Sequence, residues 1–194
     1  MTLCFATNNA HKIKEISAML PPGFELQSLQ EIGCNDELPE NETSIQGNSL
    51  SKAQYVWENF QTSCFADDSG LEVYALNGDP GVYSAMYAGP QRSHADNIEL
   101  LLSNMEGKTD RSARFLTVIT LVLNGEVHQF EGIAEGEILE EPRGEGGFGY
   151  DPVFQPLGLD VSFAEMKPEE KNAISHRARA FHKLINFLHG NTKF

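Results

Sequence analysis

The sequence predicts a single α/β domain over residues 1–194, built on a mixed sheet flanked by helices. The composition is that of an ordinary globular protein, with 194 residues of which 40% are apolar and 22% charged, enough for one core. The chain opens with a strand–helix–strand pattern, which favours parallel strands. Later, apolar runs on either side of Asn124-Gly125 indicate a hairpin. Together these patterns predict both strand directions in one sheet.

The first third of the chain provides the strand–helix–strand pattern. Thr2 to Ala6 is expected as a short buried strand, and a helix with apolar residues at helical spacing follows until Pro21-Pro22-Gly23 stops it. A second strand is expected over Phe24 to Leu29. An acidic loop from Gly33 to Thr43 then leads into a helix from about Ser44 to Phe60.

The middle of the chain begins with an expected third strand, Ser63 to Ala66, which ends abruptly in Asp67-Asp68-Ser69-Gly70. The apolar run Leu71 to Leu76 follows. Ser93, with Asp96 three residues later, resembles a capping box and predicts the start of a helix.

The last third carries the hairpin and a terminal helix. Strands are expected over Arg114 to Leu123 and Glu126 to Ile133, with a further strand over Glu137 to Leu139. Gly144 to Asp151 is a glycine-rich loop, and a last helix is expected from about Ile174 to Leu188.

Charge and cysteine content exclude several classes of protein. Lys plus Arg is 14 and Asp plus Glu is 28, a formal net charge of −14, which argues against a general nucleic-acid binder or docking on anionic lipid. The three cysteines form no C-x-x-C motif, and neither a membrane span nor a secretion signal is recognisable. A reduced, cytoplasmic protein is therefore expected.

Two polar clusters stand next to expected strands. Thr7-Asn8-Asn9-Ala10-His11-Lys12 lies at a strand-to-helix junction, where free N–H groups and the Lys12 charge suit phosphate; a plain Asn cap beside a solvated Lys is the alternative. In Asp67-Asp68 adjacent strand side chains point to opposite faces, so at most one carboxylate faces a given site. That carboxylate could bind a hard cation or act as a general base, unless the segment is simply a turn.

Two further clusters lie near the C-terminus. The run from Gly144 to Pro152 matches G-x-G-x-x-G, but no helical pattern follows it, which argues against a dinucleotide-binding fold. It can bring its backbone close to a ligand, with Phe148 and Tyr150 stacking on a ring, or be merely flexible. Lys167 to Arg177 places cations against the start of the last helix, where a bound anion would relieve the unfavourable dipole; a solvated helix start is the alternative. Together the four clusters predict a nucleotide-phosphate site.

These segments also carry a family resemblance. ATNNAHKIKEI, FADDSGLEV, GDPGVYSAMYAG, GGFGYDPVF and EEKNAISHRARA occur in order over nearly the whole chain. Together they closely resemble the inosine/xanthosine triphosphate pyrophosphatase family. The resemblance implies an elongated, two-lobed α/β fold with a cleft between the lobes, and a homodimer. It also implies Mg²⁺-dependent hydrolysis of ITP, dITP and XTP to monophosphate and pyrophosphate, which cleanses the nucleotide pool.

The resemblance also implies roles for individual residues. Asp68 would bind Mg²⁺ and act as the base for water, and Glu40 is the best match for a second metal carboxylate. Substrate contacts are implied for Thr7, Asn8, Asn9, Ala10, His11, Lys12, Ser69, Phe148, Gly149, Tyr150, Asp151, Lys171, His176 and Arg177. Three positions depart from the family pattern, since Asn8 stands where many relatives have Gly, Gly47 where relatives often have Glu, and Met86 where many have Arg.

Two other functions remain open from the sequence. One is a nucleotide pyrophosphatase for other modified bases, and the other is a nucleotide-binding module without turnover. The carboxylate of Asp68 and the cation of Lys171 disfavour the second, because a sensor needs no metal-side carboxylate. For base selectivity, Arg177 is the candidate, because its donors can bond the 6-oxo group of hypoxanthine but not the amino group of adenine.

Overall fold

The computed structural model describes residues 1–191. Its strands are β1 (Thr2–Phe5), β2 (Glu25–Gln27), β3 (Cys64–Val73), β4 (Ser112–Leu123), β5 (Glu126–Ile138) and β6 (Phe154–Pro156). Its α-helices are α1 (Ala10–Ala18), α2 (Ile45–Phe60), α3 (His94–Asn104), α4 (Pro168–Ile174) and α5 (His176–Asn191).

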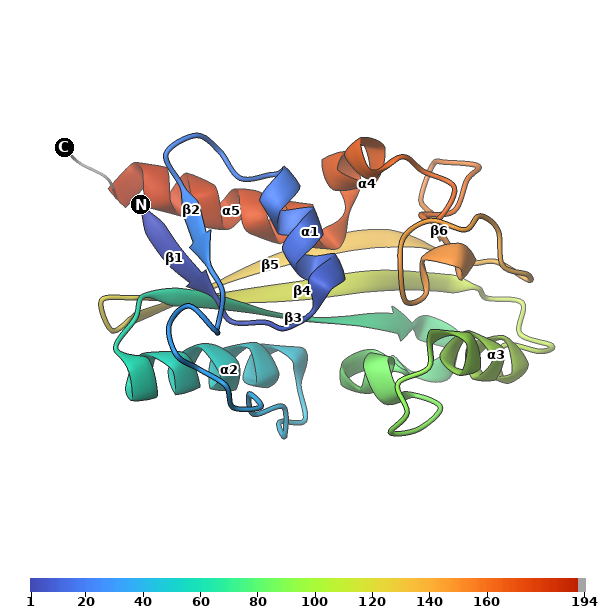
Figure 1. Ribbon diagram of the computed structural model, residues 1–194. Coiled ribbons are helices and arrows are strands. Elements are labelled where there is room, and N and C mark those ends of the chain that lie inside the picture. The colour runs from blue at the N-terminus through green and yellow to red at the C-terminus, as the bar shows by residue number, and fades with distance from the viewer. Residues whose placement is uncertain (192–194) are drawn as a thin grey trace. The chain divides into compact units, whose positions relative to one another are not determined.

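The strands form one mixed sheet, as predicted (Figure 1). The strand order is β2-β1-β3-β4-β5-β6. β1 is parallel to both β2 and β3, whereas β6 is antiparallel to β5. The hairpin of β4 and β5 is confirmed at Asn124 and Gly125, which adopt positive φ angles of 52° and 89° as a two-residue hairpin turn requires.

The chain divides into two compact units, and each has its own core. Unit 1 comprises residues 1–68, 117–132 and 177–194, and unit 2 comprises residues 69–116 and 133–176. Two units agree with the lobes that the resemblance implies. The cleft, and the expectation that residues 1–194 act as one domain, stay predictions.

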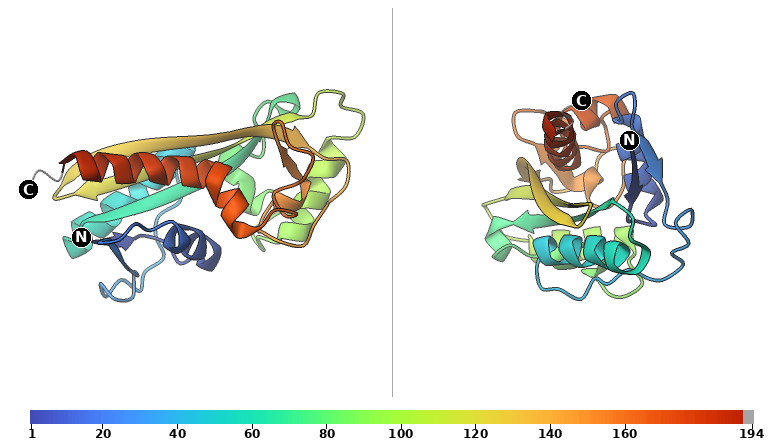
Figure 2. Two further views of the ribbon diagram at one scale, coloured as in Figure 1. Left: turned by 90° about the horizontal axis from the view of Figure 1, so that it is seen from above. Right: turned by 90° about the vertical axis from the view of Figure 1, so that its left-hand side faces the viewer.

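In unit 1, residue parity assigns the strand side chains to two layers. One layer packs against α1 and α5 and includes Leu3, Phe5, Phe65, Ile119 and Leu121. The other packs against α2 and includes Cys4, Ala6, Cys64, Ala66 and Val122. The right-hand view of Figure 2 shows α5 and α2 on opposite sides of the strands. The alternation follows from the two-residue repeat of a strand.

Trp57 of α2 packs on the hairpin turn of unit 1. A Cβ placed on Gly125 would lie 3.3 Å from the Trp57 ring, an unusually close contact. Glycine at this position therefore serves both the positive φ and the approach of the indole.

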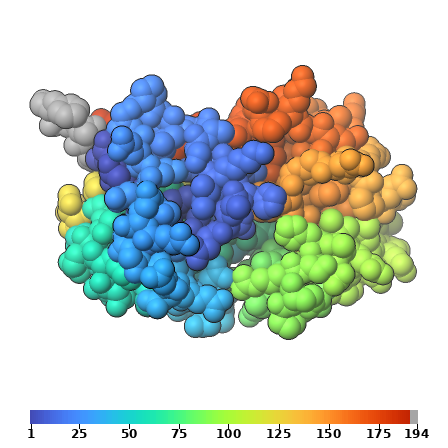
Figure 3. Space-filling model, viewed as in Figure 1, coloured from blue at the N-terminus to red at the C-terminus, as the bar shows by residue number. Residues whose placement is uncertain are grey.

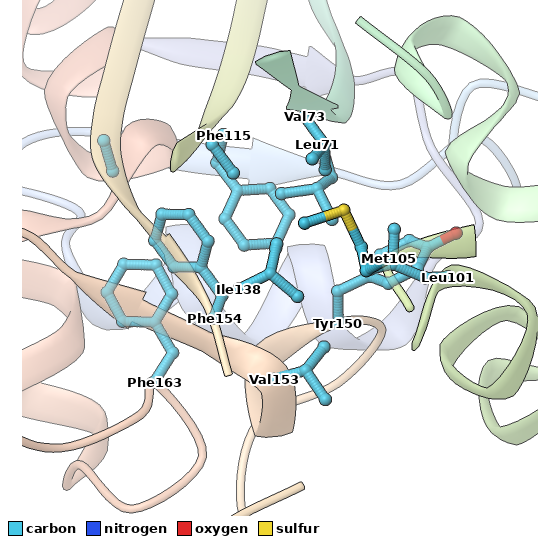
Figure 4. Close-up of a cluster of buried hydrophobic side chains, with 12 residues drawn as sticks. Leu71, Val73, Leu101, Met105, Phe115, Ile138, Tyr150, Val153, Phe154 and Phe163 are labelled. Atoms are coloured by element: carbon cyan, nitrogen blue, oxygen red, sulfur yellow. The ribbon is translucent and has the colours of Figure 1, made fainter. Parts of the chain in front are cut away.

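The core of unit 2 is built around aromatic rings (Figure 4). The ring of Phe115 lies 4.6 Å from that of Phe154, edge to face, and 6.1 Å from that of Phe163. Tyr150 joins this cluster, 5% exposed, and its hydroxyl donates a 2.8 Å hydrogen bond to the carbonyl oxygen of Ser84. The expectation that Tyr150 offers its ring for stacking is therefore wrong, because the ring is part of the core.

Three expectations about the elements need correction. β3 does not end at Asp67 but continues through Val73, because the buried carboxylates find cationic partners. The expected strand at Glu137 is the end of β5. The expected last helix is α5 and begins at His176 rather than at about Ile174, because Ser175 is extended and separates it from α4, a helix that was not predicted.

Candidate functional site

Asp67 and Asp68 continue the two layers of unit 1. Asp67 follows the parity of Phe65, whose layer packs against α1 and α5, and Asp68 follows that of Ala66, whose layer packs against α2. Their partners confirm the prediction that the two carboxylates face different groups, because those partners come from different helices.

On the side of β3 that carries Asp67, the side chains form a buried ion-pair network. Lys12 Nζ lies 2.9 Å from Asp67 Oδ1, and Arg177 Nε lies 2.9 Å from Asp67 Oδ2. Arg177 Nη1 also lies 2.6 Å from Glu15 Oε2. Arg177 is 1% exposed and Asp67 is fully buried. Burial alone would raise the pKa of Asp67, but Lys12 and Arg177 outweigh it and hold that pKa well below its usual range.

The Asp68 side is built from α2 and the acidic segment before it. Lys52 Nζ lies 3.4 Å from Asp68 Oδ1 and 2.8 Å from Glu40 Oε1. Asn48 Nδ2 donates a 3.3 Å hydrogen bond to Asp68 Oδ2, while its Oδ1 accepts one of 2.9 Å from Glu42 N. Asn48 therefore ties the acidic segment to the strand. Burial raises the pKa of Asp68, against the opposing charge of Lys52.

This side reaches solvent. The side chain of Asp68 is 12% exposed and that of Glu40 is 38% exposed. Residues 35–37 and 40–44 are exposed, and the segment before α2 lies at the surface in the space-filling view (Figure 3). A proton-accepting carboxylate next to solvent is an arrangement that can activate water.

The N-terminus of α1 is capped by its own sequence. Asn9 Oδ1 accepts hydrogen bonds from His11 N at 3.0 Å and Lys12 N at 3.2 Å, and Thr7 Oγ1 accepts one from Asn9 N at 3.1 Å. The Asn cap is thus confirmed, but Lys12 is not simply solvated, since it pairs with Asp67. Asn8 and Ala10 are exposed, and phosphate binding by residues 7–12 stays a prediction.

In unit 2, a buried ion pair organises the glycine-rich loop. Lys171 Nζ lies 2.6 Å from Asp151 Oδ2, which also accepts a 2.8 Å hydrogen bond from Phe148 N. The same ammonium lies 4.9 Å from the centre of the Phe148 ring. Any side chain at Gly147 would collide with Asp151 Oδ2. The loop is therefore held by specific contacts, and half-buried Phe148 is its candidate platform for a ring.

Other predicted residues of unit 2 also have defined places. His176 is buried and stacks on Phe115, with ring centres 4.6 Å apart. Ser69 is half-buried in β3, and Gly149 N donates a 3.3 Å hydrogen bond to His94 Nδ1. Lys171 lies in the last turn of α4, where a cation is favourable, so its expected conflict with a helix dipole is wrong.

Sequence reasoning missed several members of these clusters, Lys52 above all. A signal was available, because Ser49, Lys52, Ala53 and Val56 fall on one face of α2 and are all buried. A lysine on a buried helical stripe needs an anionic partner. Asn48, Glu15 and His94 give no comparable local signal.

The donor set around Lys52 fits a hard divalent cation. Among residues 1–191, no three or more His, Cys, Asp and Glu side chains come together as a metal site, so a metal here would need ligands besides the protein's. Glu40 and Asp68 provide two carboxylates that converge on one point. That set suits Mg²⁺, which keeps several waters and is commonly bound by one or two carboxylates together with substrate phosphates.

No helix in the described part of the chain is long and apolar enough to cross a membrane.

Comparisons with known proteins point to one family. The sequence model of the Ham1 family matches residues 3–187. A Flavobacterium psychrophilum protein named dITP/XTP pyrophosphatase is 50% identical over 188 residues, covering 97% of this chain and 99% of that protein. The Staphylococcus aureus Ham1 structure has a TM-score of 0.91 at 37% identity, and the match covers 99% of this chain and 100% of that chain. A Coxiella burnetii HAM1 structure has a TM-score of 0.91 at 35% identity, and the match covers 98% of this chain and 99% of that chain.

Proposed function

The chain belongs to the Ham1 family, and from that premise we propose that it hydrolyses non-canonical purine nucleoside triphosphates. The products are the monophosphate and pyrophosphate, and the substrates are ITP, dITP and XTP. The observation that carries the proposal is the 50% identity, along almost the full length of both chains, to a protein named dITP/XTP pyrophosphatase. Cleansing of the nucleotide pool, as a cytoplasmic homodimer, is the corresponding role.

Asp68 is the proposed catalytic base. It accepts a proton from water as the water oxygen attacks the α-phosphorus, and the bond to the bridging oxygen breaks so that pyrophosphate leaves. The raised pKa of this carboxyl group supports the role, because it makes the carboxylate a better proton acceptor. No covalent nucleophile is required.

The polyphosphate end of the substrate is assigned to unit 1. Residues 7–12 offer a helix N-terminus and Lys12. Glu40 and Asp68 would hold a divalent cation such as Mg²⁺, which when bound offsets phosphate charge. Lys12 and Arg177 are the proposed cationic contacts for phosphate, although both also pair with Asp67.

The proposed contacts of the nucleoside are the glycine-rich loop and Arg177. Phe148 would stack on the base, and Gly149, Tyr150 and Asp151 would contribute the surrounding loop. Ser69, Lys171 and His176 complete the proposed substrate contacts. The ion pair of Lys171 with Asp151 supports this assignment, since it fixes the backbone that would meet the ligand.

The test is the identity of the product released from ITP, with and without Mg²⁺. We expect pyrophosphate and IMP only when Mg²⁺ is present. Orthophosphate as the first product would place attack at the terminal phosphorus and contradict the proposal. ITP binding with no release would favour a nucleotide-binding module, and faster release from another modified nucleotide would favour the broader pyrophosphatase.

A further inference from the structure

Lys52 stands at the point where the carboxylates of Glu40 and Asp68 converge. Its ammonium lies 2.8 Å from the first and 3.4 Å from the second. The lysine side chain is only 6% exposed, so these carboxylates take the place of most of its water. Asn48 lies one helical turn earlier and also bonds Asp68. The turn of α2 from Asn48 to Lys52 therefore fixes the donors around Asp68.

The physical reason for a cation at this point is electrostatic. A buried carboxylate without a counter-charge destabilises the folded state. Two carboxylate oxygens lie 2.8 Å and 3.4 Å from Lys52 Nζ, and this paired anionic environment favours the ammonium form despite its burial. A divalent cation on the same two oxygens would lie against this positive charge. The ammonium and the metal therefore exclude one another.

We propose that Lys52 is a built-in counter-ion, which holds the divalent cation's place in the nucleotide-free protein and yields it when polyphosphate arrives. This inference rests on the proposed function, because it takes Glu40 and Asp68 as the metal-binding pair. The flexible stem of lysine lets the ammonium turn away, and phosphate oxygens offer it new anionic partners. The metal then binds weakly to the free protein, and metal and nucleotide strengthen each other's binding.

The test titrates Mn²⁺ alone into nucleotide-free protein, and follows free Mn²⁺ by electron paramagnetic resonance. Lys52→Met and Lys52→Gln both remove the charge, and Gln keeps a hydrogen-bond donor in case Met impairs folding. We expect both to bind Mn²⁺ more tightly than wild type, by roughly 5- to 150-fold, the usual range of coupling between sites. Lys52→Arg keeps a cation and should bind like wild type.

Two controls make the result specific. Lys14→Met changes the net charge equally from an exposed position of α1, so any gain it shows is the general effect of charge. The double variant Lys52→Gln/Asp68→Asn should lose the gain of the single variant. The inference is overturned if the Lys52 variants bind Mn²⁺ no more tightly than Lys14→Met, or if the gain survives loss of Asp68. Because no nucleotide is present, failure of the pyrophosphate assay would be a separate result.

Discussion

Two neighbouring aspartates on β3 are chemically identical but have different surroundings. Asp67 lies in a closed network with Lys12, Arg177 and Glu15, away from solvent. Asp68 lies beside Lys52 and Asn48 at the edge of an exposed acidic segment. The pKa of the first carboxyl group is lowered and that of the second is raised.

The difference shows how two adjacent residues of a strand can place one carboxylate in a buried ion-pair network and the other beside solvent. Two cations lie within 3 Å of Asp67, and this fixes its charge and leaves it a weak base. The contacts of Asp68 are longer, 3.4 Å to the ammonium of Lys52 and 3.3 Å to the amide of Asn48, and its side chain is 12% exposed. The face of the sheet, not the residue type, therefore sets the surroundings of each carboxylate, and the proposed catalytic role goes to the one that reaches solvent.

The largest expected effect is on turnover of Asp68→Asn. The substitution is nearly isosteric but removes both the basic oxygen and a metal charge, so kcat for pyrophosphate release should fall roughly 10²- to 10⁴-fold. The circular dichroism spectrum should stay that of wild type. An equal loss of kcat in folded Asp67→Asn would break the comparison, because both carboxylates would then serve the chemistry.

Asp67→Asn should mainly lower the free energy of unfolding. It leaves the buried cations of Lys12 and Arg177 without their shared carboxylate, and breaking a buried pair in this way costs about 3–5 kcal/mol. Urea denaturation followed by circular dichroism measures the change. A loss no greater than that of Asp68→Asn would mean that the network contributes little to stability.

The pH dependence of stability should have opposite signs at the two positions. The lowered pKa of Asp67 means that its contribution is present above its unfolded pKa of about 4 and is lost as pH falls through the folded value. The raised pKa of Asp68 means that its contribution is present below about pH 4 and is lost as pH rises through the folded value. Urea curves of the three proteins from about pH 3 to about pH 7 give the difference in free energy of unfolding between wild type and each variant. As pH rises, that difference should grow for Asp67→Asn and shrink for Asp68→Asn.

Arg177→Ala tests whether the closed side also touches the substrate. If Arg177 donates to the 6-oxo group, the ratio of kcat/KM for ITP over ATP should fall roughly tenfold or more, and the ratio for ITP over GTP much less. All three substrates are measured on the same preparation, so loss of folded protein cancels in the ratios. An unchanged ratio would assign Arg177 to the network with Asp67 and Glu15 alone and so sharpen the comparison.

Local signals predicted much of the fold. The hairpin turn at Asn124-Gly125 and the caps at Asn9 and Ser93 depend on nearby residues only, and all three are confirmed. The end of β3 was misplaced because Asp, Ser and Gly favour turns in isolation. What overrides that preference is tertiary, since Lys12 and Arg177 reach Asp67 from 55 and 110 residues away.

The candidate site shows the same division. The carboxylate of Asp68 could be singled out because it follows a buried strand. The role of Lys52 could not be predicted, because its partners Glu40 and Asp68 lie 12 and 16 positions away in opposite directions along the chain. The pairing of Lys171 with Asp151 spans 20 positions and was invisible for the same reason.

The contact of Trp57 with the hairpin turn gives the protein a natural optical probe. The chain has one tryptophan, and it lies in unit 1, where its indole touches Gly125. Four of the five tyrosines, Tyr74, Tyr83, Tyr87 and Tyr150, lie in unit 2. Excitation of the indole alone therefore reports when the hairpin leaves α2, whereas tyrosine absorbance follows mainly the other unit. Unfolding curves that coincide would show the two units melting together, and curves that separate would give each unit its own midpoint without a label.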